Sequence, residues 1–247
     1  MTDLDICAPS AELQGCLLEH QEELLIHTIQ FHDLMNRYES AIKEVYTKLE
    51  ILKNDFHLHN NRDCITMIQT RIKTPVSILN KLKRKNIPIS MESIRTELND
   101  VAGIRVICSF IDDIYMLAEK LRNQDDINIV SIKDYIQNPK PNGYRSYHMI
   151  MEVPVFFSEA KEYVRVELQI RTVAMDFWAS LEHDIKYKKD VKNCDNLVAQ
   201  LKACADTIAD TDHRMMKLRD QIIGGASKAD TSSSRVHPDE KHTNCST

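Results

Sequence analysis

The stretch "YVRVELQIRTVAMDFW", from Tyr163 to Trp178, decides the fold. Apolar residues occupy every second position of its first part: Val164, Val166, Leu168 and Ile170. This alternation is typical of a β-strand that buries one face against a hydrophobic core. The other face carries Arg165, Glu167, Gln169 and Arg171. Almost any polar residue suffices to face water, so a carboxylate flanked by an amide and two guanidiniums indicates a candidate functional surface.

The segments on both sides of this strand predict an α+β protein. Alternating patterns predict strands at about 104–110, 127–136, 144–157 and 162–172, the last two joined as a hairpin. Helical patterns predict helices at about 10–56, 63–85, 91–99, 111–124, 172–189 and 195–223, the second broken at Thr74–Pro75 because proline disfavours a helical residue before it. We expect a mixed β-sheet of about four to five strands surrounded by helices, with long N- and C-terminal helices.

Four parts follow from these elements. We expect an N-terminal helical region at 1–60, a central domain at 61–190, a C-terminal helix at 191–223 and a disordered tail at 224–247, where apolar residues are almost absent. An apolar stripe recurs every seven residues of the first part: Leu17, Leu24, Phe31, Tyr38, Val45 and Leu52, with Met35, Ile42, Leu49 and Phe56 beside it. The stripe predicts packing against the rest of the fold or a seam between subunits, and both remain open.

The composition of the 247 residues argues against several classes of protein. No apolar run approaches the roughly 18 residues that span a membrane, and the N-terminus lacks the features of a signal peptide. The seven cysteines show no metal-ligand spacing and are expected to be reduced thiols, which favours a cytoplasmic location. A net charge of −5 disfavours a stable nucleic-acid partner.

Positive charge is nevertheless concentrated in one place. Residues 71–85, "RIKTPVSILNKLKRK", contain basic side chains and no acidic one. Such a patch in an acidic protein favours a compact anionic ligand over a polymer. Because the sequence contains neither GxxxxGK[ST] nor GxGxxG after a strand, side chains rather than a glycine-rich loop would bind phosphates.

Three segments join the opening strand as candidate parts of a site. In the basic segment, Ser77, Lys81 and Arg84 fall on neighbouring helix faces, although a solvated basic face gives the same pattern. In "DVAGIR", Asp100 before a strand is a candidate Mg²⁺ ligand or, alternatively, a helix cap or salt bridge. In "KPNGYRSYH", Tyr144 offers a ring on which a base could stack, unless it is an ordinary residue of a hairpin.

These segments, together with "DYIQNPKPNGYRSYH" and "VELQIRTVAMDFWASLEH", resemble the motifs of the RelA/SpoT-type synthetase domain. The similarity runs from about Thr66 to Lys188 and is greatest to the small alarmone synthetases, the RelP-like branch in particular. It implies a nucleotidyltransferase-like synthetase fold and transfer of the β,γ-pyrophosphate of ATP to the 3′-hydroxyl of GDP or GTP. It also implies Mg²⁺ as cofactor and assembly as a homotetramer.

The resemblance assigns a role to each candidate side chain. Asp100 and Glu167 would be catalytic and bind Mg²⁺, with Glu167 activating the 3′-hydroxyl. ATP would be held by Arg71, Lys73, Ser77, Lys81, Arg84 and Arg105, with Arg84 and Arg105 sandwiching the adenine. The acceptor nucleotide would be held by Lys140, Asn142, Tyr144, Arg145, His148, Gln169 and Arg171, with Tyr144 stacking on guanine.

Other functions remain as alternatives. A catalytically silent nucleotide- or RNA-binding regulatory module is one, and an interaction protein built on the N-terminal helix is another. The pairs His32–Asp33 and His183–Asp184 resemble the His-Asp motif of alarmone hydrolases, but further metal ligands are not evident, so we expect a synthetase only. His183 with Glu182 would position substrate or be structural. The product-activated branch tends to carry asparagine at Asp176, which disfavours that regulation here.

Overall fold

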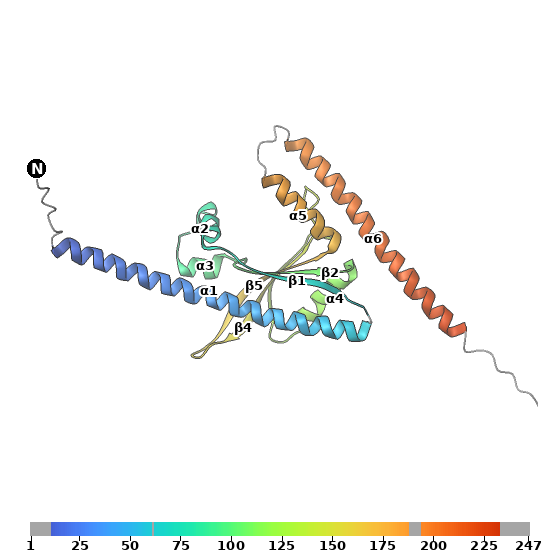
Figure 1. Cartoon of the computed structure of the whole chain (residues 1–247), viewed down its shortest axis with the longest axis horizontal. Helices are drawn as coiled ribbons and strands as arrows, with labels where there is room; N and C mark the ends of the chain where they lie inside the picture. Colours follow the sequence, from blue (N-terminus) through green and yellow to red (C-terminus); the bar gives the residue numbers. More distant parts are fainter. Residues whose placement is uncertain (1–10, 61, 188–193, 233–247) are drawn as a thin grey trace, which may run out of the picture.

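The computed structural model describes residues 11–60, 62–187 and 194–232, which form a mixed β-sheet flanked by helices (Figure 1). The elements are α1 (Ala11–Asn60), β1 (Ile65–Ile72), α2 (Pro75–Arg84), α3 (Met91–Glu97), β2 (Ala102–Cys108), α4 (Ile111–Arg122), β3 (Asn128–Asp134), β4 (Tyr147–Phe156), β5 (Lys161–Thr172), α5 (Val173–Tyr187) and α6 (Cys194–Ser232). The α+β class and the long terminal helices are confirmed.

The described part of the chain contains one five-stranded sheet, in the order β1-β2-β5-β4-β3. β2 and β5 pair in parallel at its centre, while the remaining neighbours are antiparallel, and β4 and β5 form the expected hairpin. On β5 the alternating side chains from Val164 to Ile170 are buried and belong to the main core. The opening prediction about this strand is therefore confirmed.

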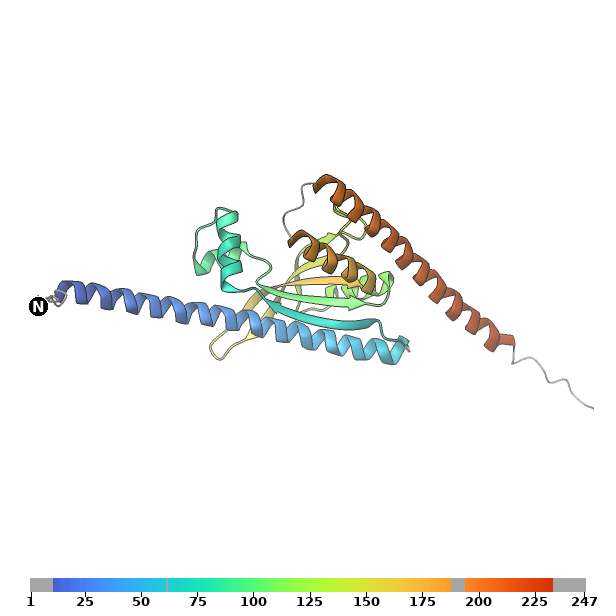
Figure 2. The same ribbon diagram turned by 45° about the horizontal axis from the view of Figure 1, so that its top comes forward.

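Helix α1 runs beneath the sheet and extends well beyond it (Figure 2). Tyr38, Val45 and Leu49 are buried in the main core, so this half of the stripe packs against the fold, as one of the two interpretations predicted. Nearer the N-terminus, Leu25 and Ile29 are exposed. Leu17 and Leu24 lie outside the described side chains. The seam between subunits thus remains a proposal for the projecting half of α1.

The helix expected at 63–85 was wrong in its first part. Residues 65–72, "ITMIQTRI", form β1, and only Pro75–Arg84 form a helix, α2. Isoleucine and threonine dominate this strand, and β-branched side chains favour extended backbone over helix. β1 lies at the edge of the sheet and pairs with β2 along its length, which satisfies the backbone groups on that side. The proline after Thr74 begins α2 at a position where its missing N–H costs nothing.

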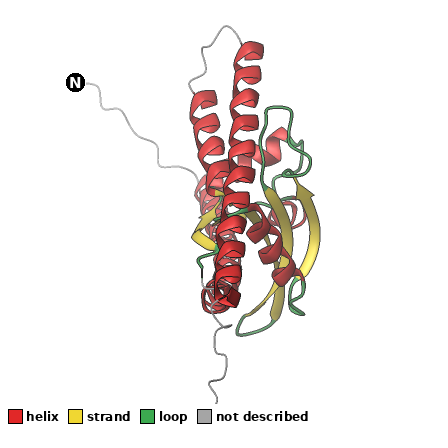
Figure 3. Ribbon diagram, turned by 90° about the vertical axis from the view of Figure 1, so that its right-hand side faces the viewer, coloured by secondary structure: helices red, strands yellow, loops and turns green. Residues whose placement is uncertain are grey.

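At the C-terminal end, α6 packs beside α5, so the two helices stand next to each other along the strands (Figure 3). Its backbone is helical to Ser232, beyond the expected end at 223. The backbone of residues 224–232, which were assigned to the predicted tail, is therefore helical, because a helix propagates easily from turns already formed. Residues 233–247 lie outside the described residues. No described helix is long and apolar enough to cross a membrane.

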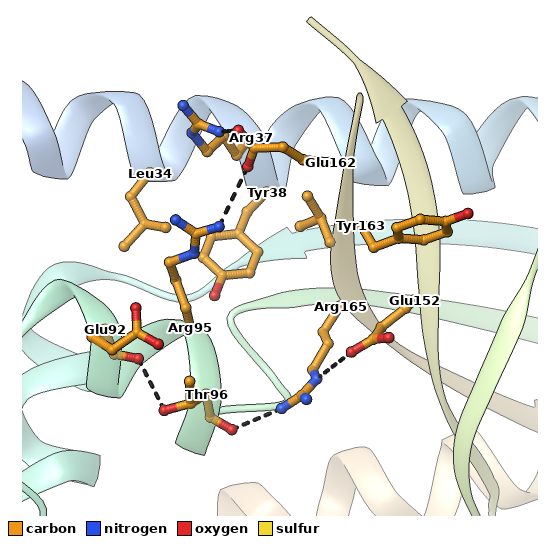
Figure 4. A pocket seen from close by; sticks show the side chains of 11 residues that line it. Leu34, Arg37, Tyr38, Glu92, Arg95, Thr96, Glu152, Glu162, Tyr163 and Arg165 are labelled. Atoms are coloured by element: carbon orange, nitrogen blue, oxygen red, sulfur yellow. Dashed lines mark hydrogen bonds and ion pairs between the residues drawn. The ribbon is translucent and has the colours of Figure 1, made fainter. Parts of the chain in front are cut away.

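A hollow of about 330 Å³, which we call the α1 pocket, lies between α1, α3 and the β4–β5 hairpin (Figure 4). Arg37 and Arg95 both pair with Glu162, and Arg165 pairs with Glu152 at 2.9 Å. Each arginine of the pocket therefore has a glutamate partner within it. These pairs tie α1 and α3 to the hairpin.

Candidate active site

A second hollow, which we call the cleft, has a volume of about 670 Å³ and lies on the polar face of β1, β2 and β5. Gly103 on β2 pairs with Arg71 on one side and Glu167 on the other, and side chains of paired residues project to the same face. Gly103 has no side chain, so the space above it stays open between the side chains of Arg71 and Glu167. The cleft is lined by Gln69, Thr70, Arg71, Lys73, Asp100, Gly103, Ile104, Arg105, Glu167 and Gln169.

Asp100 is held at the mouth of β2 by two lysines. Its carboxylate lies 2.7 Å from Lys73 Nζ and 2.6 Å from Lys81 Nζ. Burial raises the pKa of Asp100, but the hydrogen bonds from both lysines outweigh it, and the pKa lies below its usual range. Asp100 is therefore ionised at neutral pH, and the sequence-based alternative of a salt bridge is realised in this structure.

Glu167 lies at the centre of the cleft floor. Its carboxylate is 3.3 Å from His148 Nδ1 and accepts a hydrogen bond of 3.2 Å from Gln169 Nε2. Burial and the charge of Asp100 raise its pKa, whereas the contacts with His148 and Gln169 lower it, and the net shift is downward. Asp100 and Glu167 thus line one cleft, and they lie near enough for the charge of Asp100 to affect the pKa of Glu167.

Aromatic rings lie beside Glu167, next to the residues that line the cleft. Tyr144 Oη lies 2.9 Å from His148 Nε2, and the two rings meet edge to face. Tyr135, which the sequence analysis did not single out, packs edge to face against both rings. Lys140 Nζ lies 4.7 Å from the centroids of both tyrosine rings. Tyr135 belongs to the motif "DYIQNPKPNG", which directly precedes Tyr144 in the chain. This nearness in sequence was the signal from which its contact with Tyr144 could have been predicted.

Arg171 is almost fully buried behind this aromatic group. Its Nη2 donates to Tyr144 Oη at 2.7 Å and to Gln169 Oε1 at 3.2 Å, and its Nη1 donates to Asp176 Oδ1 at 2.9 Å. Its Nε donates to Ser146 Oγ at 3.4 Å. Each nitrogen of this guanidinium therefore has an acceptor inside the protein.

Two predicted acceptor residues turn toward the C-terminal helices. Arg145 donates to the carbonyl of Ala205 at 2.9 Å and to Asp206 at 3.3 Å, both on α6. Asn142 donates to Glu182 Oε1 on α5 at 3.0 Å. Neither side chain lines the cleft. Glu182 thus supports the acceptor loop, while the side chain of His183 lies outside the described ones.

Gly143 makes the contact with α6 possible. Its φ of +89° is in the left-handed region, and a Cβ at this position would lie 2.5 Å from Ala205 Cβ. Only glycine fits both constraints. The loop that carries Lys140 and Tyr144 therefore rests directly on α6.

Arg71 and Arg105, two of the predicted donor residues, line the cleft together with Lys73. Ser77 lies in the first turn of α2, where its backbone N–H is capped by Thr74. Arg84 is exposed at the end of the same helix. The cleft is lined by three of the six predicted donor residues, while Ser77, Lys81 and Arg84 lie outside its lining. Of these, Lys81 contacts the cleft residue Asp100.

The described residues contain no group of three or more histidine, cysteine or acidic side chains that could hold a metal ion. Asp100 and Glu167 nevertheless fit Mg²⁺, since this ion commonly takes one or two protein carboxylates and completes its shell with phosphate oxygens and water. Both carboxylates face one cleft rich in cationic side chains, as a metal-bridged polyphosphate requires.

The fold and this cleft define a protein that binds phosphorylated ligands through side chains of a mixed sheet. A family model described as the region found in RelA/SpoT proteins matches residues 70–192. The GTP pyrophosphokinase YwaC of Bacillus subtilis is 42% identical over 185 residues, which cover 75% of this chain and 88% of YwaC. The GTP pyrophosphokinase YjbM of the same organism is 33% identical over 193 residues, 78% of this chain and 90% of YjbM.

The comparison with solved structures agrees. The crystal structure of small alarmone synthetase 2 from Bacillus subtilis superposes with a TM-score of 0.69 at 41% identity, covering 77% of this chain and 98% of that one. The chain therefore belongs to the RelA/SpoT family, among its small alarmone synthetases.

Proposed function

We propose that the protein is a GTP pyrophosphokinase that transfers the β,γ-pyrophosphate of ATP to the 3′-hydroxyl of GDP or GTP and releases AMP. One observation carries this proposal: cationic side chains, Asp100 and Glu167 line a single cleft, and His148 links Glu167 to the Tyr144 ring beside it. Such a transfer requires two polyanions to be aligned and their charge to be neutralised, and it requires little covalent chemistry of the protein.

The donor nucleotide is proposed to lie over β1 and β2. Arg71 and Lys73 would contact its phosphates, and Arg105 would stack on its adenine. Lys81 contacts Asp100 at the edge of this site. Ser77 and Arg84 would contact the donor nucleotide from α2. The four charges of ATP explain why cationic side chains gather here in an acidic protein.

Mg²⁺ is the proposed cofactor, with Asp100 and Glu167 as its protein ligands. When bound, Mg²⁺ would neutralise phosphate charge and acidify the acceptor hydroxyl. Lys73 and Lys81, which pair with Asp100 in this structure, are flexible and could then turn to phosphate oxygens. The two lysines thereby keep Asp100 ionised and oriented when the cleft holds no nucleotide.

The acceptor nucleotide is proposed to stack its guanine on Tyr144. Lys140 is exposed, so a base could displace its ammonium from the ring at little cost. His148 and Gln169 lie between this ring and Glu167, where the ribose would sit. Asn142 and Arg145 would support the loop from behind, and Arg171 would orient Tyr144.

Glu167 is the proposed acceptor of the 3′-hydroxyl proton. A raised pKa would make it a stronger base, but the pKa of Glu167 in this structure is lowered. We therefore propose that the ionised carboxylate of Glu167 orients the hydroxyl and receives its proton, while Mg²⁺ held by Asp100 and Glu167 would supply the acidification of the hydroxyl.

The variant Glu167→Gln tests this function directly. The protein is incubated with ATP, Mg²⁺ and either GDP or GTP, and the products are separated by ion-exchange chromatography. The unchanged protein should form AMP and a guanosine nucleotide that keeps its 5′-phosphates and carries a new 3′-diphosphate. The variant should lose about 10²- to 10⁴-fold in kcat, the usual contribution of a general base. Absence of product from the unchanged protein would favour the silent regulatory module instead. Full turnover by the variant would refute the role of Glu167.

We also propose a homotetramer in the cytoplasm. The projecting half of α1 exposes Leu25, Ile26 and Ile29, and the distal half of α6 exposes Met215, Leu218, Ile222 and Ile223. Apolar helix faces of this kind mark protein interfaces. Light scattering should give four times the chain mass for the unchanged protein and a smaller mass for the double variant Leu25→Glu/Ile29→Glu. Equal masses would contradict the interface.

The proposed location in the cytoplasm agrees with the buried thiols of Cys64 and Cys108, which favour a reducing compartment.

A further inference from the structure

Two side-chain amides, Gln69 and Gln169, line the cleft, and they differ in how their polar atoms are used. Gln169 donates to Glu167 at 3.2 Å and accepts from Arg171 at 3.2 Å, so both ends of its amide are occupied. Gln69 is exposed and donates to Met67 Sδ at 3.0 Å, although a thioether is a weak acceptor. Within the described residues, no donor reaches its amide oxygen. The amide of Gln69 is therefore available to a ligand in the cleft.

Gln69 lies where the base of the donor nucleotide is proposed to bind. It pairs with Arg105 across β1 and β2, and side chains of paired residues project to the same face. Arg71 follows on that face about 7 Å further along the strand, and Lys73 lines the cleft beyond it. The order along β1 is thus an amide and then two cations. A nucleotide with its base over Arg105 and its phosphates on the two cations matches this order.

The proposed reaction requires the two bases to be told apart, because both nucleotides are purines. Stacking on a guanidinium or on a tyrosine ring does not do this, since every base has a π-face. Hydrogen bonds to the base edge do. Adenine presents the N6 amino donor beside the N7 acceptor, whereas guanine presents two acceptors, O6 and N7. A glutamine amide carries one acceptor and one donor group side by side, so it complements the N6/N7 edge of adenine only.

We propose that Gln69 selects adenine at the donor side of the cleft. Its Oε1 accepts from the N6 amino group, and its Nε2 leaves Met67 Sδ and donates to N7. The placement of the donor base rests on the proposed function. With this contact, GTP is accepted at Tyr144 but disfavoured as a donor, so the pyrophosphate moves from an adenine nucleotide to a guanine nucleotide.

Calorimetry with the full chain, Mg²⁺ and no acceptor nucleotide measures this contact in the absence of transfer. The ligands are ATP, purine riboside 5′-triphosphate, which lacks the N6 amino group, and 7-deaza-ATP, which lacks the N7 acceptor. In the unchanged protein each analogue should bind about 2- to 12-fold more weakly than ATP, the usual effect of one hydrogen bond. In Gln69→Leu, which removes the amide at similar size, the three Kd values should become alike.

The matched control is Gln200→Leu, the same change at an exposed glutamine of α6 that donates to Asn196 and does not line the cleft. It should keep the differences between ATP and its analogues. If Gln69→Leu does not fold, Gln69→Ala removes the same amide and should give the same result. Equal Kd values in the unchanged protein overturn the inference, as do unchanged differences in a folded Gln69 variant.

Turnover provides a second readout. With GDP as acceptor and equal concentrations of ATP and GTP, release of AMP reports ATP as donor and release of GMP reports GTP as donor. The ratio of AMP to GMP should fall by about fivefold or more in Gln69→Leu, the lower end for a bidentate base contact. An unchanged ratio overturns the inference while the proposed function stands. Absence of product from the unchanged protein overturns the proposed function, and the Kd values then decide on Gln69 alone.

Discussion

The α1 pocket and the cleft are both lined by arginines, yet they differ in how those arginines are paired. In the α1 pocket Arg37, Arg95 and Arg165 each contact a glutamate of the same pocket. In the cleft Arg105 pairs with Asp176 and Lys73 with Asp100, but, among the described residues, no acidic side chain pairs with Arg71. A balanced set of charges stabilises neighbouring elements, whereas a cation without a partner remains available to an anionic ligand. The unpaired arginine therefore distinguishes the cleft from the α1 pocket.

The largest difference between the two pockets should appear when one carboxylate is neutralised in each. Asp100→Asn should lower kcat/KM by about 10²- to 10³-fold, comparable to losing one group that stabilises charge in a transition state. Glu162→Gln makes the same chemical change in the α1 pocket and should leave kcat/KM within about twofold, the small effect expected away from a site. Steady-state assays of both variants decide this, and equal losses would remove the distinction.

A smaller effect is expected from aromatic side chains. Tyr144→Ala should raise the KM for the acceptor by about 5- to 150-fold, which corresponds to the roughly 1–3 kcal/mol of a base stacked on an aromatic ring. The KM for ATP should change less, because Arg171 and Asp176 stand between Tyr144 and the donor residue Arg105. Tyr163→Ala, at the exposed ring beside the α1 pocket, should change neither KM. Similar rises for both nucleotides would contradict the stacking role.

The smallest effect concerns stability in alkaline solution. Burial raises the pKa of Tyr38 in the α1 pocket to about 12, and its hydroxyl donates to the carbonyl of Ile94. Because the unfolded phenol ionises near pH 10, the stabilisation is complete below pH 10 and decreases as the pH rises toward 12. Tyr38→Phe should show a smaller decrease, because burial also raises the pKa values of Tyr115 and Tyr147, and it should lose about 1 kcal/mol at neutral pH. Urea titrations from pH 8 to 11.5 measure both, and parallel curves would contradict the assignment.

Much of the fold followed from local pattern. The two faces of β5 were evident because burial on one side imposes a period of two. The nature of β1 was missed because a basic, proline-containing segment such as 63–85 carries helix and strand signals at once, and pairing with β2 decides between them. The pairing of Arg37 with Glu162 could not be foreseen, since nothing local relates residues so far apart in the chain. Asp176 was noticed only for regulation, because its two arginines meet only in the folded sheet.

The seat of Gly143 on Ala205 has a consequence for biosynthesis. All five strands of the described sheet precede α6 in the chain, so the sheet is complete in sequence before the ribosome has made Ala205. Domains generally fold as units as synthesis proceeds. The loop that carries Lys140 and Tyr144 therefore lacks its support on Ala205 until α6 has been made. The acceptor site predicted for this loop is expected to stay incomplete in a nascent chain until that point.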